Sequence, residues 1–104
     1  MKQIGYHNRN SLVMLHNCGN GIYFDAQIEM MAPEVISFLH LPDDCSSLQE
    51  VKEKYGHQTT LMGTISPSWL MSATNDQIVS ECKRQIDIMS KDGGFILATG
   101  CEYP

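Results

Sequence analysis

Short apolar runs alternate with amphipathic stretches along the chain. The apolar runs cover residues 12–15, 35–39, 60–64 and 95–99, and we expect each of them to form a strand. The first run is continuous and apolar, as in a parallel strand that is covered on both faces. Because the stretches between the runs carry helix signals, the expected order of elements is β-α-β-α-β-α-β.

The first two helices have recognisable ends. The first is expected over residues 22–31 and should stop near Pro33, because the residue before a proline disfavours helical geometry. The second should begin after Ser47, since Ser47 and Glu50 have the spacing of a capping box, and Gly56 is a natural end for it.

The third helical region lies between the last two apolar runs. Residues 66–71 predict a short helical turn, with Pro67 tolerated in its first turn. Thr74 and Gln77 predict a second capping box, and the glycine pair at 93–94 should end the helix that follows. The apolar residues of this helix form one stripe: Ile78, Val79, Cys82, Ile86 and Met89.

Strands that alternate with helices predict a parallel sheet with right-handed crossovers. Two architectures fit a single domain over residues 1–104: an open α/β sheet, or part of a (β/α)₈ barrel. A whole barrel takes about 250 residues, so this sequence would supply close to half of one. A half barrel leaves two unprotected sheet edges. It would need a partner copy, further chain or a rearrangement to an open three-layer sheet.

Composition narrows the class of protein. Hydrophobic residues make up 42% and charged residues 18%, which is typical of a globular chain. Lys and Arg total 7 against 12 Asp and Glu and form no stripe, so we expect no nucleic-acid partner. No apolar run approaches the roughly 20 residues of a membrane helix, and the first residues do not read as a signal peptide. We therefore expect a cytoplasmic protein with no membrane contact. Its four cysteines could form two disulfides, but without a secretory signal we expect reduced thiols.

The polar residues that end two of the apolar runs are the main chemical candidates. His16 and Cys18 face the same way if the strand runs through them, and Cys101 follows the last run. Parallel α/β folds build their sites at the carboxyl ends of strands. One imidazole and two thiolates suit zinc, and three ligands leave the open position of a catalytic site. The alternative is that the cysteines are small buried hydrophobes and the histidine a packing residue.

Other polar residues are secondary candidates. Asp43 and Asp44 follow a strand end and could line a site, although acids are common in loops. The Gly-Asn-Gly segment at 19–21 could cradle an anion at a helix start, but a tight turn explains it equally well. The remaining histidines fall in polar or loop settings typical of solvated side chains: His7, His40 and His57.

Three motifs stand out when they are taken together: His-Asn-Cys-Gly at 16–19, Gly-Thr-Ile-Ser-Pro at 63–67, and the closing Gly-Gly-Phe-Ile-Leu-Ala-Thr-Gly-Cys-Glu-Tyr-Pro at 93–104. The chain from about residue 11 to residue 104 resembles the uroporphyrinogen decarboxylase superfamily. The resemblance implies the C-terminal part of that superfamily's (β/α)₈ barrel. Residues 74–79 loosely resemble the start of one of its helices.

The resemblance is closest to one branch, the corrinoid-dependent methyltransferases, which include methylcobamide:coenzyme M methyltransferases. The decarboxylases proper lack the His-x-Cys pair. Membership of that branch implies that His16, Cys18 and Cys101 bind Zn²⁺. It also implies that a small thiol, or tetrahydrofolate in some relatives, accepts a methyl group from a methylated corrinoid on a separate corrinoid protein. Where the family often has an acid after its third-strand motif, this sequence has Ser66.

Three functions stay open at this point. The first is a fragment of a zinc-dependent methyltransferase. The second is a decarboxylase-like tetrapyrrole enzyme, against which His16 and Cys18 argue. The third is a non-catalytic α/β module that self-associates through exposed sheet edges or binds a partner, and it predicts no stoichiometric zinc. The family's N-terminal half lies outside this sequence, so whether this chain alone is an enzyme is left open.

Overall fold

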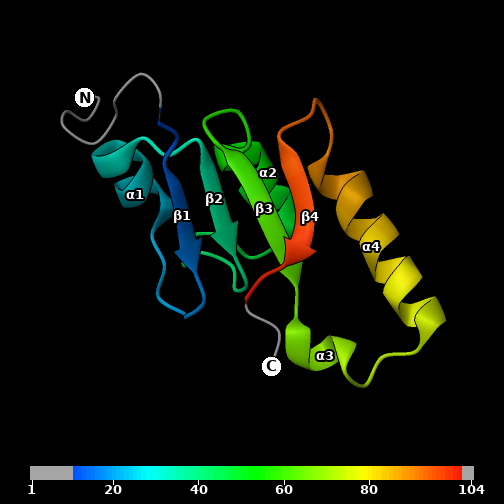
Figure 1. Ribbon diagram of the computed structural model, residues 1–104. Helices are drawn as coiled ribbons and strands as arrows, with labels where there is room; N and C mark the ends of the chain where they lie inside the picture. The colour runs from blue at the N-terminus through cyan, green and yellow to red at the C-terminus, as the bar shows by residue number, and fades with distance from the viewer. Residues whose placement is uncertain (1–10, 102–104) are drawn as a thin grey trace.

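The computed structural model describes residues 11–101. Within them, strands and helices alternate much as predicted. The elements are β1 (Met14–Asn17), α1 (Phe24–Met31), β2 (Val35–Phe38), α2 (Leu48–Tyr55), β3 (Thr60–Ile65), α3 (Pro67–Leu70), α4 (Asn75–Met89) and β4 (Phe95–Thr99). The strands form one parallel sheet in the order β1-β2-β3-β4 (Figure 1). The predicted α/β class and parallel sheet are therefore confirmed.

The helices gather on one side of the sheet. In Figure 1, α2 lies behind the strands, while α1 lies beside β1 and α4 beside β4. Residues of all three helices pack in one core cluster, which places them on the same side of the sheet. Helices on one face of a parallel sheet are the arrangement of a barrel wall, whereas an open doubly wound sheet has them on both faces. The structure is thus compatible with half of a (β/α)₈ barrel. None of the described helices is both long and apolar enough to cross a membrane.

The core lies between β2, β3 and the helices behind them. The ring of Phe24 makes edge contacts with Phe38, at a centroid distance of 5.2 Å, and with Tyr55, at 5.5 Å. Burying each such side chain contributes about 1.5–3 kcal/mol. This packing holds β2 firmly against α1 and α2. The fully buried side chains of the core are Phe24, Ile36, Phe38, Val51, Leu61 and Met89.

The helix starts follow the capping predictions closely. Thr74 and Gln77 make both bonds of the predicted capping box at the start of α4. Ser47 Oγ accepts the Glu50 N–H at 3.2 Å, as predicted for α2. The Glu50 carboxylate, however, accepts the N–H of Ser46 at 2.9 Å instead of that of Ser47.

Burial differs from the prediction in two places. β1 is not covered on both faces, because exposed and half-buried residues alternate along it. In the described residues it is also an edge strand that pairs with β2 alone. Leu12 and Met14 are accordingly 80% and 55% exposed. On α4, Val79 and Ile86 of the apolar stripe are exposed, whereas Gln85 is buried. Gln85 is held by polar contacts, since its Oε1 accepts the backbone N–H of Thr64 at 3.0 Å.

Candidate metal centre

Cys18 and Cys101 reach one another from opposite edges of the sheet. β1 and β4 are the outer strands, with β2 and β3 between them. After β4 the chain turns back across the carboxyl ends of the inner strands (Figure 1), and the Gly100 N–H donates to the Ile65 carbonyl at 2.8 Å. This crossing brings the Cα atoms of Cys18 and Cys101 to 5.8 Å.

Gly100 makes the crossing possible. It is buried, and a Cβ at this position would lie 2.6 Å from the Leu39 Cα and 2.8 Å from the Phe38 carbonyl oxygen. Both are backbone atoms at the end of β2, so they can give way only if the strand moves. Gly19, which follows Cys18, has open space where its Cβ would be. Of the two glycines beside the cysteines, only Gly100 is needed for the chain after β4 to pass close to the end of β2.

The three predicted ligands converge in the structure. One donor atom from each of His16, Cys18 and Cys101 lies within 4.8 Å of the other two. The Nε2 atom of His16 is 2.8 Å from the Cys18 sulfur. β1 ends at Asn17, so His16 lies on the strand and Cys18 is the first residue beyond it. The structure therefore places these residues together at the carboxyl edge of the sheet, as the sequence predicted.

The two sulfurs are bonded to each other as a disulfide. The expectation of reduced thiols is wrong for this pair, because the chain crossing sets their Cα atoms within the roughly 4.4–6.8 Å that a disulfide spans. Cys45 and Cys82 are free thiols. A sulfur in a disulfide has no thiolate charge, so the bond has to be reduced before both cysteines can bind a metal.

The reduced donor set fits zinc. Tetrahedral zinc, with bonds of about 2.3 Å to sulfur and about 2.0 Å to nitrogen, holds its donors about 3.5–3.8 Å apart. The three donors here already lie within 4.8 Å of one another. One imidazole nitrogen and two thiolates are ligand types that zinc prefers, and three ligands leave a fourth position for a substrate. Whether this cluster binds zinc stays a prediction.

His16 is oriented by its neighbour on β2. Its Nδ1 atom lies 3.0 Å from the Oγ of Ser37, and the two residues are register partners in the parallel pair β1–β2. Ser37 is 3% exposed. Sequence reasoning missed this residue. Its one signal was a lone hydroxyl inside the otherwise apolar run at 35–39.

A hollow of about 430 Å³ adjoins the cluster and is lined by His16, Cys18, the loop after β1 and the start of α1. The side-chain amides of Asn17 and Gln27 bond to each other in both directions, at 3.1 Å and 2.8 Å, and stiffen its wall. The Gly-Asn-Gly segment at 19–21 forms the loop here, with Gly21 at a φ of 73°. A positive φ is typical of a glycine where the chain bends sharply, and residues 19–21 form a bend.

The acidic loop after β2 has a structural role. Asp44 accepts a hydrogen bond from the Tyr55 hydroxyl and lies 3.5 Å from the Lys54 ammonium. The bond from Tyr55 lowers the pKa of the Asp44 carboxyl. Burial, together with that bond, raises the pKa of Tyr55. These contacts tie the loop to α2. Asp43 is exposed, and neither acid belongs to the His-Cys-Cys cluster.

The other polar candidates also lie outside the cluster. His40 and His57 are exposed, as predicted, and His7 falls outside the described residues. Ser66 caps α3, where its Oγ accepts the Trp69 N–H at 3.4 Å. The position at which the family often has an acid is thus used here to start a helix.

Comparison with known proteins gives a match at the level of the family. The model of the uroporphyrinogen decarboxylase (URO-D) family matches residues 1–104. No curated protein and no solved structure matches the sequence. The family match includes the whole stretch from about residue 11 to residue 104 over which the motifs resemble that superfamily.

Proposed function

Because the chain belongs to the uroporphyrinogen decarboxylase family, we propose that it is the zinc-binding part of a corrinoid-dependent methyltransferase. The methyl group passes from a methylated corrinoid, held by a separate corrinoid protein, to a small thiol such as coenzyme M or to tetrahydrofolate. One observation carries the proposal: His16, Cys18 and Cys101 converge at the carboxyl edge of the sheet. That donor set suits zinc with an open position.

Each residue has a distinct part in this proposal. Nε2 of His16 and the two reduced sulfurs hold Zn²⁺. Zinc held there would supply Lewis-acid chemistry that favours the thiolate form of a small thiol near neutral pH. The hollow beside the cluster gives the body of the acceptor a place to lie. The paired amides of Asn17 and Gln27 fix one wall of that hollow.

Zinc content tests the proposal. The full chain is purified under reducing conditions, and bound zinc is measured after zinc addition and dialysis. We expect about one zinc per chain in the parent and none in Cys18→Ser or Cys101→Ser, because a tetrahedral site with two protein ligands is weak. Cys82→Ser is the matched control, since Cys82 is a free thiol on α4. A parent chain that stays metal-free contradicts the proposal and favours a non-catalytic module.

A tetrapyrrole decarboxylase is the second candidate, favoured by the name of the family model. Under this candidate the His-Cys-Cys cluster would take no part in the reaction. Loss of CO₂ from a porphyrinogen on adding the chain, followed by mass spectrometry and unaltered by a chelator and by Cys18→Ser, would support this candidate. Methyl transfer from a methylated corrinoid to a thiol, abolished by the same substitution, would support the first.

We also propose that two copies of the chain associate through their sheet edges. In the described residues β1 and β4 each pair on one side alone, and the exposed side chains of Leu12 and Met14 lie on or next to the free edge of β1. Unpaired parallel edges tend to associate. Light scattering should give twice the chain mass of 11.7 kDa, and a monomer mass at all concentrations contradicts the pairing.

A further inference from the structure

Ser37 is a buried hydroxyl in an apolar strand. It is 3% exposed, and its neighbours on β2, Ile36 and Phe38, are fully buried in the core. A hydroxyl in such a place is costly unless it is hydrogen-bonded. Its partner is His16 Nδ1 at 3.0 Å. The strand therefore keeps a polar group whose contact is with the imidazole of the cluster.

The two ring nitrogens of His16 face different partners. Nδ1 faces the Ser37 hydroxyl, and Nε2 faces the Cys18 sulfur at 2.8 Å. A nitrogen that binds a metal needs its lone pair free, so the other nitrogen has to carry the proton. When Nε2 is the ligand, Nδ1–H donates to Ser37 Oγ. The partner of the second ring nitrogen commonly fixes both the tautomer and the orientation of a metal-bound histidine.

A serine can serve the ring in either tautomer, since its hydroxyl both donates and accepts. Without metal, the ring can carry its proton on Nε2, next to the sulfur, while the serine O–H donates to Nδ1. With metal, the proton moves to Nδ1 and the hydroxyl turns to accept. A backbone carbonyl in the same place would accept only. The ring can therefore change tautomer without moving, because Ser37 turns its hydroxyl.

We propose that Ser37 is a positioning residue that holds His16 with Nε2 toward Cys18 and Cys101, so that Nε2 is the atom that binds the metal. The inference rests on the proposed zinc site and deepens it. It follows from the contact between two register partners and from the burial of Ser37. Ser37 does not touch the reacting groups. It acts on them through the imidazole.

The test compares the zinc affinity of the reduced parent chain with that of its variants, measured by competition with a chromophoric chelator. For Ser37→Ala we expect affinity about 10- to 100-fold weaker, as for other lost partners of metal-bound histidines. Ser37→Thr restores the hydroxyl and should recover most of the affinity. The matched control is Thr59→Val, which removes another buried hydroxyl whose Oγ1 bonds the Pro33 carbonyl at 3.1 Å, away from the cluster. It should leave zinc affinity unchanged.

Nitrogen NMR of the His16 ring gives a second readout. It reports which ring nitrogen binds the metal, which would not depend on Ser37 if its role were only structural. In the zinc-loaded parent we expect Nδ1 to carry the proton and Nε2 to bind the metal. Ligation through Nδ1 overturns the proposal even if no variant folds. Equal zinc affinity in the parent and Ser37→Ala also overturns it, while leaving the zinc site intact. A parent that binds no zinc overturns the proposed function, and with it this inference.

Discussion

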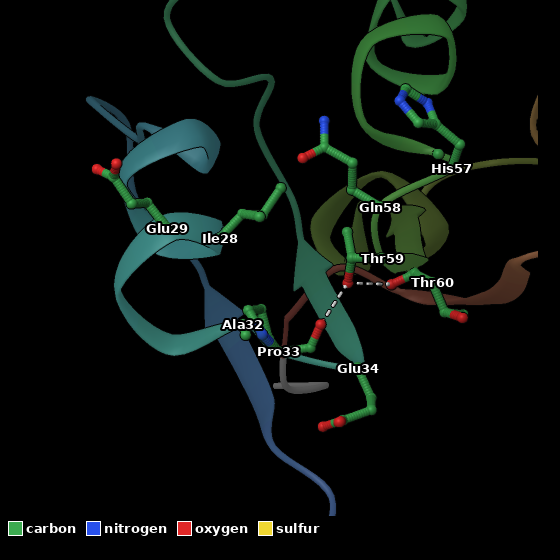
Figure 2. Close-up of a pocket in the computed structure, with 10 residues that line it drawn as sticks. Ile28, Glu29, Ala32, Pro33, Glu34, His57, Gln58, Thr59 and Thr60 are labelled. Carbon is green, nitrogen blue, oxygen red and sulfur yellow. Dashed lines mark hydrogen bonds between the residues drawn. The ribbon is translucent and has the colours of Figure 1, made fainter. Parts of the chain in front are cut away.

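The cavities at the two ends of the sheet differ in size and in the chemistry of the side chains around them. At the amino ends of the strands, α1, the Pro33 turn and the loop before β3 enclose an open groove of about 710 Å³ (Figure 2). It is larger than the hollow of about 430 Å³ beside the cluster. The groove holds Glu29, Glu34 and His57 on separate elements, and none of them belongs to the cluster of candidate metal ligands in the described residues. The smaller hollow adjoins one imidazole and two sulfurs within 4.8 Å of one another.

We rank the carboxyl end of the sheet above the larger groove because of strand direction, not cavity volume. A large pocket is the usual first hypothesis for a site, and in this chain that rule would select the amino ends. In parallel α/β folds, however, loops at the carboxyl ends carry function, whereas residues at the amino ends serve stability. Figure 2 shows the second role in Thr59, whose hydroxyl donates to the Pro33 carbonyl. Substitutions at the two ends of the sheet should therefore have different effects on zinc affinity and on stability.

The largest effect on zinc binding should come from the redox state of the Cys18–Cys101 pair. With the Cys18–Cys101 disulfide intact, we expect no bound zinc, because neither sulfur is a thiolate. Reduction should raise the zinc content to about one per chain. Zinc and free thiols are measured in the same samples before and after reduction, with Cys45→Ser as a control that behaves like the parent. Equal zinc binding by the oxidised chain would show that the ligands have been misassigned.

A thiol at the same end of the sheet but outside the cluster should be unreactive. Burial, and then the charge of Asp44, raise the pKa of the Cys45 thiol to about 11. A thiolate forms above the pKa, so near neutral pH the thiolate fraction of Cys45 is about 100-fold below that of a thiol with the ordinary pKa of 9.0. Alkylation of Cys45 should be slower by a similar factor and should speed up as the pH rises toward 11.

The measurement uses the Cys82→Ser chain with its disulfide intact, so that Cys45 is its one free thiol. Mass spectrometry follows the adduct over time, and the denatured chain sets the ordinary rate. Rapid alkylation of the folded chain at neutral pH would mean that Cys45 is not shielded. The difference in thiol reactivity between the cluster and Cys45 would then be smaller than the structure indicates.

The crossing of the chain over the strand ends should be the next most sensitive feature. Gly100→Ala puts a Cβ 2.6 Å from the Leu39 Cα, and such overpacking costs about 1–3 kcal/mol. Because the strain falls one residue before Cys101, we expect weaker zinc binding as well as a lower free energy of unfolding. Gly19→Ala is the matched control, since its Cβ meets open space beside Cys18. Chelator competition and denaturant unfolding of the reduced chains check both effects, and equal results for the two variants would contradict a special role for Gly100.

Much of this fold is readable from the sequence because local signals agree with the final structure. The capping box of Thr74 and Gln77 forms as predicted, and the helix before Pro33 ends at Met31. The predicted helix start at 22 is early by two residues. Ile22 is buried by packing in the core from the chain just before α1, a tertiary contact that local helix signals do not contain.

The residues of the candidate site could be proposed from the sequence. The disulfide between its two cysteines and the residues that support the site could not. Residue type and strand order suggested that His16, Cys18 and Cys101 meet, and the family resemblance favoured them as a ligand set. The structure brings their donor atoms together, and zinc binding stays a prediction. The disulfide was missed because the expected compartment, rather than the distance between the two cysteines, decided that prediction. Ser37 and Gly100 were missed for a different reason. Each acts through a contact across strands, His16 in one case and Leu39 in the other, that exists only after the sheet has formed.

The smallest effect should come from the amino end. Thr59→Val removes the bond to the Pro33 carbonyl while keeping the shape of a buried side chain that is 7% exposed. A single hydrogen bond of this kind contributes about 1 kcal/mol, so the free energy of unfolding should fall by about that amount in denaturant titrations. Zinc affinity should not change, because the strand separates this contact from its carboxyl end. A loss of zinc affinity comparable to that of Ser37→Ala would show that the two ends of the sheet are coupled, and the division into a stabilising end and a chemical end would fail.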